Sequence, residues 1–134
     1  MRPEVRARVT VGAPLKPSED PEKVLRALQN VLGEGGEFHI GKSEVRMDVG
    51  DLSALEKIHD QLRDRHVRAA GRRILLRSID RGTATILLNK QAAVAGVVAL
   101  CGNEEESPLG AIRIRISSPK IEEIVDWLTA YEGG

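Results

Sequence analysis

Aromatic residues are almost absent from this chain, which has one Trp, one Tyr and one Phe among 134 residues. The core must therefore be built from aliphatic side chains. A surface that stacks nucleotide bases on rows of aromatic rings is disfavoured for the same reason. Cysteine is equally scarce, and a single Cys excludes an intramolecular disulfide and fits a reducing cytoplasm.

An excess of charge of one sign is also missing. The chain has 20 Lys and Arg against 20 Asp and Glu, unlike a strongly basic nucleic-acid binder or a polybasic membrane binder. No segment reaches the roughly 18 apolar residues of a membrane span, and the first residues lack the apolar region of a signal peptide. We therefore expect one cytoplasmic domain, residues 1–134, without membrane contact.

Alternating apolar and polar residues predict half-buried strands. In residues 4–11 the apolar positions alternate with Glu, Arg and Thr, and residues 111–117 repeat the pattern with Ile and Arg. The strand-like segments are 4–11, 37–40, 44–49, 83–88, 97–101 and 111–117. Such alternation indicates a sheet with one covered and one open face, which is typical of antiparallel pairing.

Helices are expected between these strands. Asp20-Pro21-Glu22 has the residues of a helix start, and the apolar stripe that follows ends at Gly33. Other helical patterns begin at Asp51 or Ser53, cover 67–79, and follow Ser118-Pro119. We therefore predict an α+β fold, a two-layer sandwich of a mainly antiparallel sheet of about five strands with helices on one face.

The 67–79 helix has apolar residues on two sides. Val67, Ala70 and Ile74 form one stripe, whereas Leu76 and Ile79 fall on another side. Such a helix either packs on two sides or carries a self-association surface.

Three segments resemble uncharacterised protein family 0201, an archaeal family of small proteins. They are EVRARVTVGAPLKPSEDPEKVLRAL, LLNKQAAVAG and SPLGAIRIRI, and they occur in this order over nearly the whole chain. The resemblance implies a fold similar to the ribosomal protein that binds 5S rRNA. It also implies an association with RNA, and it supplies no catalytic residues.

Asn89-Lys90-Gln91 interrupts the most apolar stretch of the chain. Asn is a preferred N-cap, so the three residues are explained by a short helix that begins at Asn89, exposes Lys90 and Gln91 in its first turn, and ends at Gly96. The functional alternative uses the same geometry, because a helix N-terminus with an adjacent lysine attracts phosphate or carboxylate.

Arginines occupy the polar positions of three predicted strands. They are Arg6 and Arg8, Arg46, and Arg113 and Arg115. If the first and last strands pair, these side chains form a patch whose guanidinium groups suit phosphate. The competing interpretation is a solvated face on which acidic neighbours neutralise them across strands, namely Glu4, Glu37, Glu44 and Asp48.

A second basic cluster lies between residues 63 and 81. Its arginines are Arg63, Arg65, Arg68, Arg72, Arg73, Arg77 and Arg81, opposed locally by Asp64 and Asp80. The cluster is either a site for nucleic acid or another polyanion, or a solvated helix whose arginines form ion-pair networks.

No arrangement of residues indicates an enzyme, a metal or a cofactor. His39, His59 and His66 lack a ligand-like spacing with Cys, although Glu56 precedes His59 by three residues. Cys101 follows an apolar strand and is expected to be buried. The acidic residues 104–106 share a loop, which preorganises acid–base chemistry poorly.

The leading hypothesis is therefore RNA or ribonucleoprotein association through arginine–phosphate contacts. The residues assigned to it are Arg6, Arg8, Arg68, Arg72, Arg73, Arg77, Lys90, Arg113 and Arg115. The alternative is a protein–protein module, a homodimer through the apolar edge at Leu76 and Ile79, that binds no RNA. Phe38 is the only aromatic on an expected strand, and Trp127 and Tyr131 are expected in the last helix.

Overall fold

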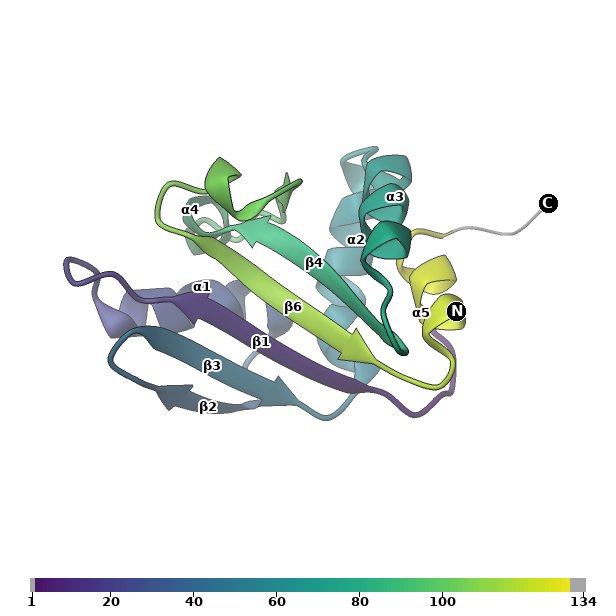
Figure 1. Cartoon of the computed structure of the whole chain (residues 1–134), viewed down its shortest axis with the longest axis horizontal. Coiled ribbons are helices and arrows are strands. Elements are labelled where there is room, and N and C mark those ends of the chain that lie inside the picture. Colours follow the sequence, from purple (N-terminus) through teal and green to yellow (C-terminus); the bar gives the residue numbers. More distant parts are fainter. Residues whose placement is uncertain (1, 131–134) are drawn as a thin grey trace.

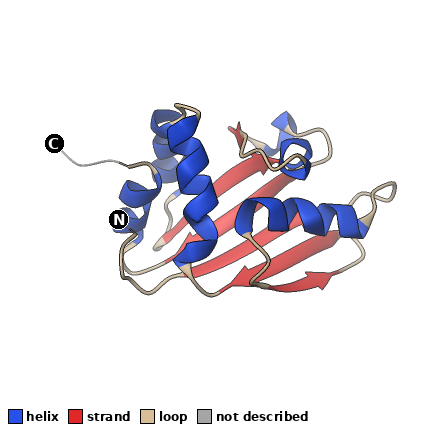
Figure 2. Cartoon of the chain, turned by 180° about the vertical axis from the view of Figure 1, so that it is seen from behind, coloured by secondary structure: helices blue, strands red, loops and turns tan. Residues whose placement is uncertain are grey.

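The computed structural model describes residues 2–130 and shows a six-stranded antiparallel sheet with helices across one face (Figures 1 and 2). The strands are β1 (Arg8–Pro14), β2 (Glu37–Ile40), β3 (Glu44–Val49), β4 (Thr83–Asn89), β5 (Leu100–Cys101) and β6 (Ala111–Ser117). Their order across the sheet is β2-β3-β1-β6-β4-β5, so the first and last long strands are neighbours at its centre.

Within residues 2–130, five α-helices and two 3₁₀ turns accompany the strands, and the last helix follows the last strand. They are α1 (Pro21–Leu32), η1 (Leu52–Leu55), α2 (Glu56–Asp64), α3 (Arg68–Ser78), α4 (Lys90–Val94), η2 (Glu104–Glu106) and α5 (Ile121–Leu128). The Asp20 side chain accepts a hydrogen bond from the Glu22 amide and Pro21 occupies the first turn, so α1 begins where its sequence predicts. None of the described helices is long and apolar enough to cross a membrane.

Register gives the sheet two different faces. Val9 of β1 lies opposite Val49 of β3 and Ile116 of β6, and Ile116 in turn lies opposite Ala84 of β4. All four side chains are buried under the helices. Because side chains alternate along a strand, the polar residues of these strands point away from the helices. We call that uncovered side the open face; it is turned toward the viewer in Figure 1, whereas Figure 2 looks onto the helices.

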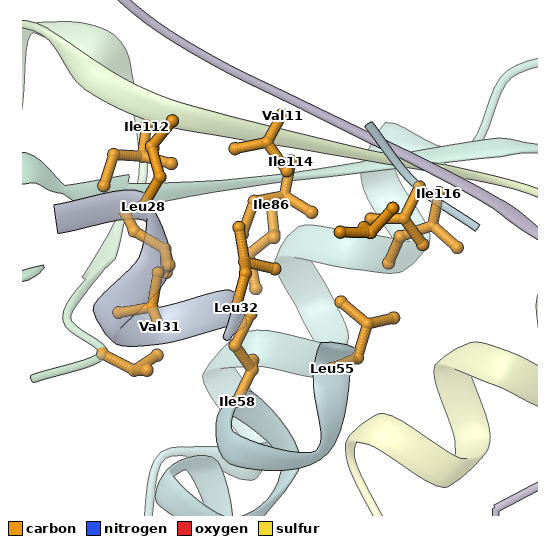
Figure 3. Packing of buried hydrophobic residues seen from close by; sticks show 14 of the residues in the cluster. Val11, Leu28, Val31, Leu32, Leu55, Ile58, Ile86, Ile112, Ile114 and Ile116 are labelled. Carbon is orange, nitrogen blue, oxygen red and sulfur yellow. The ribbon is translucent and has the colours of Figure 1, made fainter. Parts of the chain in front are cut away.

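The core between the layers is aliphatic. Ile86 and Ile114 of the sheet pack with Leu28 of α1, Leu55 of η1 and Ile58 of α2, and all are at most 1% exposed (Figure 3). Branched side chains of this kind suit the pleated surface of a strand. Removing one of them would cost about 2–5 kcal/mol.

The α+β sandwich with helices on one face is confirmed, and the details differ in four places. The strand predicted at 97–101 forms only over Leu100–Cys101. The sheet has six strands rather than about five. The first strand begins at Arg8 rather than at residue 4, and it continues to Pro14 rather than ending at residue 11. The deepest contact of α3 is made by Gly71 and Leu75, not by the predicted stripe. Tyr131 lies outside the described residues.

Gly110 adopts a conformation that other residues avoid. Its φ is +88°, and a Cβ atom there would lie 2.1 Å from Cγ of Pro14. We predict that Gly110→Ala lowers the free energy of unfolding by at least about 1–3 kcal/mol, the usual cost of such backbone strain. Chemical denaturation would measure the loss. Gly35→Ala is the control, because Gly35 has no atom within 4 Å of that position and no positive φ; equal stabilities of the two variants would contradict the prediction.

Candidate nucleic-acid interface

Pairing of β1 with β6 brings the predicted strand arginines together on the open face. Arg8 lies opposite Ser117, Thr10 opposite Arg115, and Gly12 opposite Arg113. The condition on which the predicted patch depended, pairing of the first and last strands, is therefore met. The structure also separates the patch into two parts with different acidic surroundings.

In the first part the arginines have no ion-pair partner. Across the sheet, Asp48 of β3 is separated from Arg115 by Thr10 of β1. Two strand spacings separate the backbones of these residues by about 9–10 Å. Within residues 2–130, neither Arg8 nor Arg115 forms an ion pair, and both are exposed. These two guanidinium groups are therefore available to an external anion.

The second part is a trough of about 920 Å³ at the other end of β1 and β6. Gly12 forms part of its floor, because Gly12 lies between Arg46 of β3 and Arg113 of β6 and has no side chain to fill the space. Arg46 forms a 3.3 Å ion pair with Glu44, and Arg113 pairs with Glu104. All four side chains are more than 40% exposed. Such surface pairs contribute little and can exchange for a phosphate.

The arginines of α3 lie in the helical layer, not on the open face (Figure 2). Arg72 donates to Asp126 of α5 at 2.6 Å and thereby ties α3 to α5. Arg68, Arg73 and Arg77 are exposed. The two predicted basic clusters therefore do not form one surface. One RNA segment would contact either the strand arginines of the open face or the arginines of α3.

Lys90 is the clearest correction to the predicted site. The expectation of an exposed first-turn lysine is wrong, because Lys90 is only 2% exposed. Its Nζ donates to the carbonyl oxygens of Pro14 (2.5 Å) and Leu109 (2.6 Å) and forms a 2.9 Å ion pair with Glu19. Lys90 thus holds both ends of the loop between β1 and α1 against the loop before β6, and it cannot reach a phosphate from this position.

The structural interpretation of the Asn89 corner agrees with the contacts. The Asn89 side chain caps α4 by accepting from the Ala92 amide at 2.9 Å, and Gly96 has a φ of +78° after the helix. Gln91 is exposed and lines the surface hollow between α1 and α4. A five-residue helix whose lysine is already ion-paired offers little to an anion.

The candidate catalytic groups remain dispersed. Burial, and secondarily Glu106, raise the pKa of the Cys101 thiol, which makes it a poor nucleophile. His59 stacks on Trp127 with ring centroids 5.0 Å apart. Its potential ligand atom and those of Glu56 and Asp60 lie within 4.8 Å of one another. Arg2 and Arg63 already engage these two carboxylates, so we assign no metal here.

Some residues on or beside the open face were not predicted from the sequence to belong to the site. Thr10 and Thr85 flank Arg115 on the neighbouring strands, and Lys16 contributes to the rim of the trough. The threonines could have been found from the strand alternation, since they occupy the same polar positions as the arginines. The pairing of Arg113 with Glu104 depends on how the 102–110 loop folds back, which no local pattern encodes.

The buried ion pair of Lys90 leads to a stability prediction. Lys90→Met would leave the Glu19 carboxylate buried without its partner, and breaking such a pair costs about 3–5 kcal/mol. We expect a loss of this size in urea denaturation. Lys23→Met, on an exposed position of α1, is the control. A stable Lys90→Met variant that only weakened RNA binding would show that Lys90 acts as an exposed contact instead.

Comparisons with known proteins identify a family model and relatives that this chain resembles. A family model described as RNA binding matches residues 8–118. A UPF0201 protein of Aeropyrum pernix is 39% identical over 127 residues, covering 92% of this chain and 85% of that protein. A UPF0201 protein of Sulfolobus acidocaldarius is 37% identical over 125 residues, covering 91% and 86%.

A solved structure shares the fold. The crystal structure of the UPF0201 protein from Methanococcus jannaschii has a TM-score of 0.79 and 25% identity, and the match covers 95% of this chain and 96% of that one. The predicted similarity to the ribosomal 5S-rRNA-binding protein stays a prediction. The family assignment from the sequence is confirmed: the chain belongs to the uncharacterised protein family UPF0201.

Proposed function

We propose that this protein binds RNA through the open face of its sheet, with the RNA backbone lying along β1 and β6. The observation that carries the proposal is the pair Arg8 and Arg115, two exposed side chains on adjacent central strands that have no carboxylate partner within residues 2–130. The RNA-binding description of the family model, which spans both residues, supports the same class of ligand.

The chemistry of the open face suits phosphates rather than bases. A guanidinium donates two parallel hydrogen bonds to phosphate oxygens, and hydroxyl groups such as those of Thr10 and Thr85 add neutral donors beside Arg115. Phe38 lies opposite the buried Met47 and therefore points to the helical side of the sheet. The described residues of the open face include no Phe, Tyr or Trp, and His39 is an isolated ring there. Recognition of the RNA therefore rests mainly on contacts to its sugar–phosphate backbone.

The zero net charge of the chain is compatible with this proposal, because the charges are separated in space. Glu44 and Glu104 lie at the trough, where each is already paired with an arginine. Arg115 also lines the trough but has no carboxylate partner within residues 2–130, and Arg8 lies at the other end of β1. A locally positive surface concentrates phosphate even on a neutral protein, and the attraction weakens as salt is added. The protein is then a non-enzymatic RNA-associated module.

A homodimer remains the second candidate, supported by one observation. Leu76 of α3 is 41% exposed, as expected for a self-association surface, but Ile79 packs partly against the core and is not free to join it. A dimer built on α3 would leave the open face uncovered. Changes to Arg8 and Arg115 therefore separate the two candidates, since they would not affect an α3 interface.

The arginine pair gives the first test. We expect Arg8→Ala with Arg115→Ala to lower the affinity for structured RNA about tenfold per arginine, since a hydrogen bond to a charged group contributes about 1.5–3 kcal/mol. The slope of log affinity against log salt should become shallower by about one per lost phosphate contact. Fluorescence anisotropy over a salt series measures both quantities.

The matched control is Arg68→Ala with Arg73→Ala, which removes the same charge from α3. This control should retain most of the affinity. If the α3 variant lost binding and the sheet variant kept it, the interface would lie on the helical layer and the proposal for the open face would be wrong.

The floor of the trough gives a second, steric test. A Cβ atom at Gly12 would meet nothing closer than 3.6 Å, so Gly12→Val should fold normally and place its methyl groups between Arg46 and Arg113. We expect weaker RNA binding with an unchanged melting temperature. Ala69→Val adds bulk to an exposed position of α3 and should have no effect. Unchanged affinity of the Gly12 variant would remove the trough from the interface.

A further inference from the structure

A separate hollow of about 360 Å³ lies where the start of β1 meets the end of β6 and the turn before β4. Three arginines contribute to its lining, namely Arg6, Arg8 and Arg81, together with Ser117. The lining contains no acidic residue, and within residues 2–130 none of the three arginines forms an ion pair. Three arginines therefore border one small surface depression, and the nearest acidic residues along the chain, Glu4 and Asp80, do not belong to its lining.

The backbone around the hollow is held by specific hydrogen bonds. The buried Ser118 hydroxyl donates to the Arg6 carbonyl at 2.5 Å, and the Ser118 amide donates to the Gly82 carbonyl at 3.0 Å. The hydroxyl groups of Thr83 and Ser117 lie 2.8 Å apart. These contacts join the segment before β1, the turn before β4 and the end of β6, so the arginines project from a fixed frame.

Arg81 occupies a backbone position that is unfavourable for arginine. Asp80 and Thr83 exchange two backbone hydrogen bonds, of 2.9 and 3.0 Å, around a tight turn. Both central residues of that turn have positive φ, 50° for Arg81 and 76° for Gly82. A turn of this kind prefers Asn-Gly, Asp-Gly or Gly-Gly. An arginine in such a strained position, beside a hollow that two further arginines also line, indicates a use for its side chain.

We propose that this hollow binds the terminal phosphate of an RNA strand, which deepens the proposed function and rests on it. An internal phosphodiester carries one negative charge, whereas a terminal phosphate monoester carries up to two near neutral pH. Three arginine side chains around one hollow match the doubly charged group better than the singly charged one.

The position of the hollow agrees with a strand that continues along the open face. Arg115 precedes Ser117 by two residues on β6, a step of about 6.6–6.8 Å. Arg113 lies one further step along the same strand, at the trough. An RNA strand anchored by its end in the hollow would therefore pass Arg115 and follow the trough. This placement gives the path of the RNA along the open face, and the test below assigns its 5′-to-3′ polarity.

The turn geometry provides a variant that separates binding from folding. Arg81→Asn creates the Asn-Gly turn that this conformation favours, so its melting temperature should equal or exceed that of the wild type. It removes one of the three charges. Arg26→Gln, on an exposed position of α1, is the control for charge loss elsewhere.

The test compares one short RNA in three forms, with a 5′-phosphate, with a 3′-phosphate, or with hydroxyl groups at both ends. Each competes against an internally labelled copy in an anisotropy titration. For the wild type and the Arg26→Gln control we expect one phosphorylated form to bind about tenfold tighter than the hydroxyl form. In the Arg81→Asn variant that preference should largely disappear, while affinity for the hydroxyl form changes little.

The outcomes are distinct. If wild type binds all three forms equally, or if the preference persists in Arg81→Asn, the terminal-phosphate site is wrong while RNA binding stands. If wild type binds none of the forms, the proposed function fails and the site fails with it. Preference for the 5′ or for the 3′ form states which end of the strand occupies the hollow.

Discussion

The antiparallel register between β1 and β6 is the constraint on which the rest of this structure depends. It places Val9 opposite Ile116 and Val11 opposite Ile114 beneath the helices, and the same pairing puts Thr10 opposite Arg115 on the other side. Because the side-chain period of a strand is two residues, a slip by one would send the arginines into the core and the isoleucines into solvent. The aliphatic core and the basic open face are therefore two results of one pairing.

This pairing also explains how a chain without net charge can gather arginines without carboxylate partners, within residues 2–130, on part of one face. The sheet orders its polar positions in rows, and in the row of Arg115 the nearest strand positions are threonines rather than carboxylates. Arg8 and Ser117 begin the row beyond it, next to the hollow shared with Arg6 and Arg81. Composition averages over these rows, so it underestimates what the open face can attract.

Most of the fold follows from local patterns in the sequence, and the misses have identifiable causes. Strand alternation, the Asp20 cap and the Asn89 cap each involve residues close together along the chain. The patch formed by Arg8, Arg113 and Arg115 could be predicted once pairing of the terminal strands was assumed. RNA binding by these site residues stays a prediction.

Lys90 could not be placed from sequence because its partners come from two other segments. Pro14 and Glu19 lie more than 70 residues before it, and Leu109 lies 19 residues after it. A lysine after an N-cap is normally solvated, and only the convergence of these loops changes that. Arg81 was counted in a helical cluster for a similar reason: its role at the hollow depends on β1 and β6 lying beside the turn.

The most direct test of the account is a map of the RNA contact on the protein itself. Amide chemical shifts of the ¹⁵N-labelled protein would be followed by NMR while structured RNA is added at low salt. The account predicts that the perturbed amides cluster on β1 and β6, around Thr10 and Arg115, while those of α3 change little. Perturbations confined to α3, or none at all at about 50 mM salt, where phosphate contacts are favoured, would contradict it.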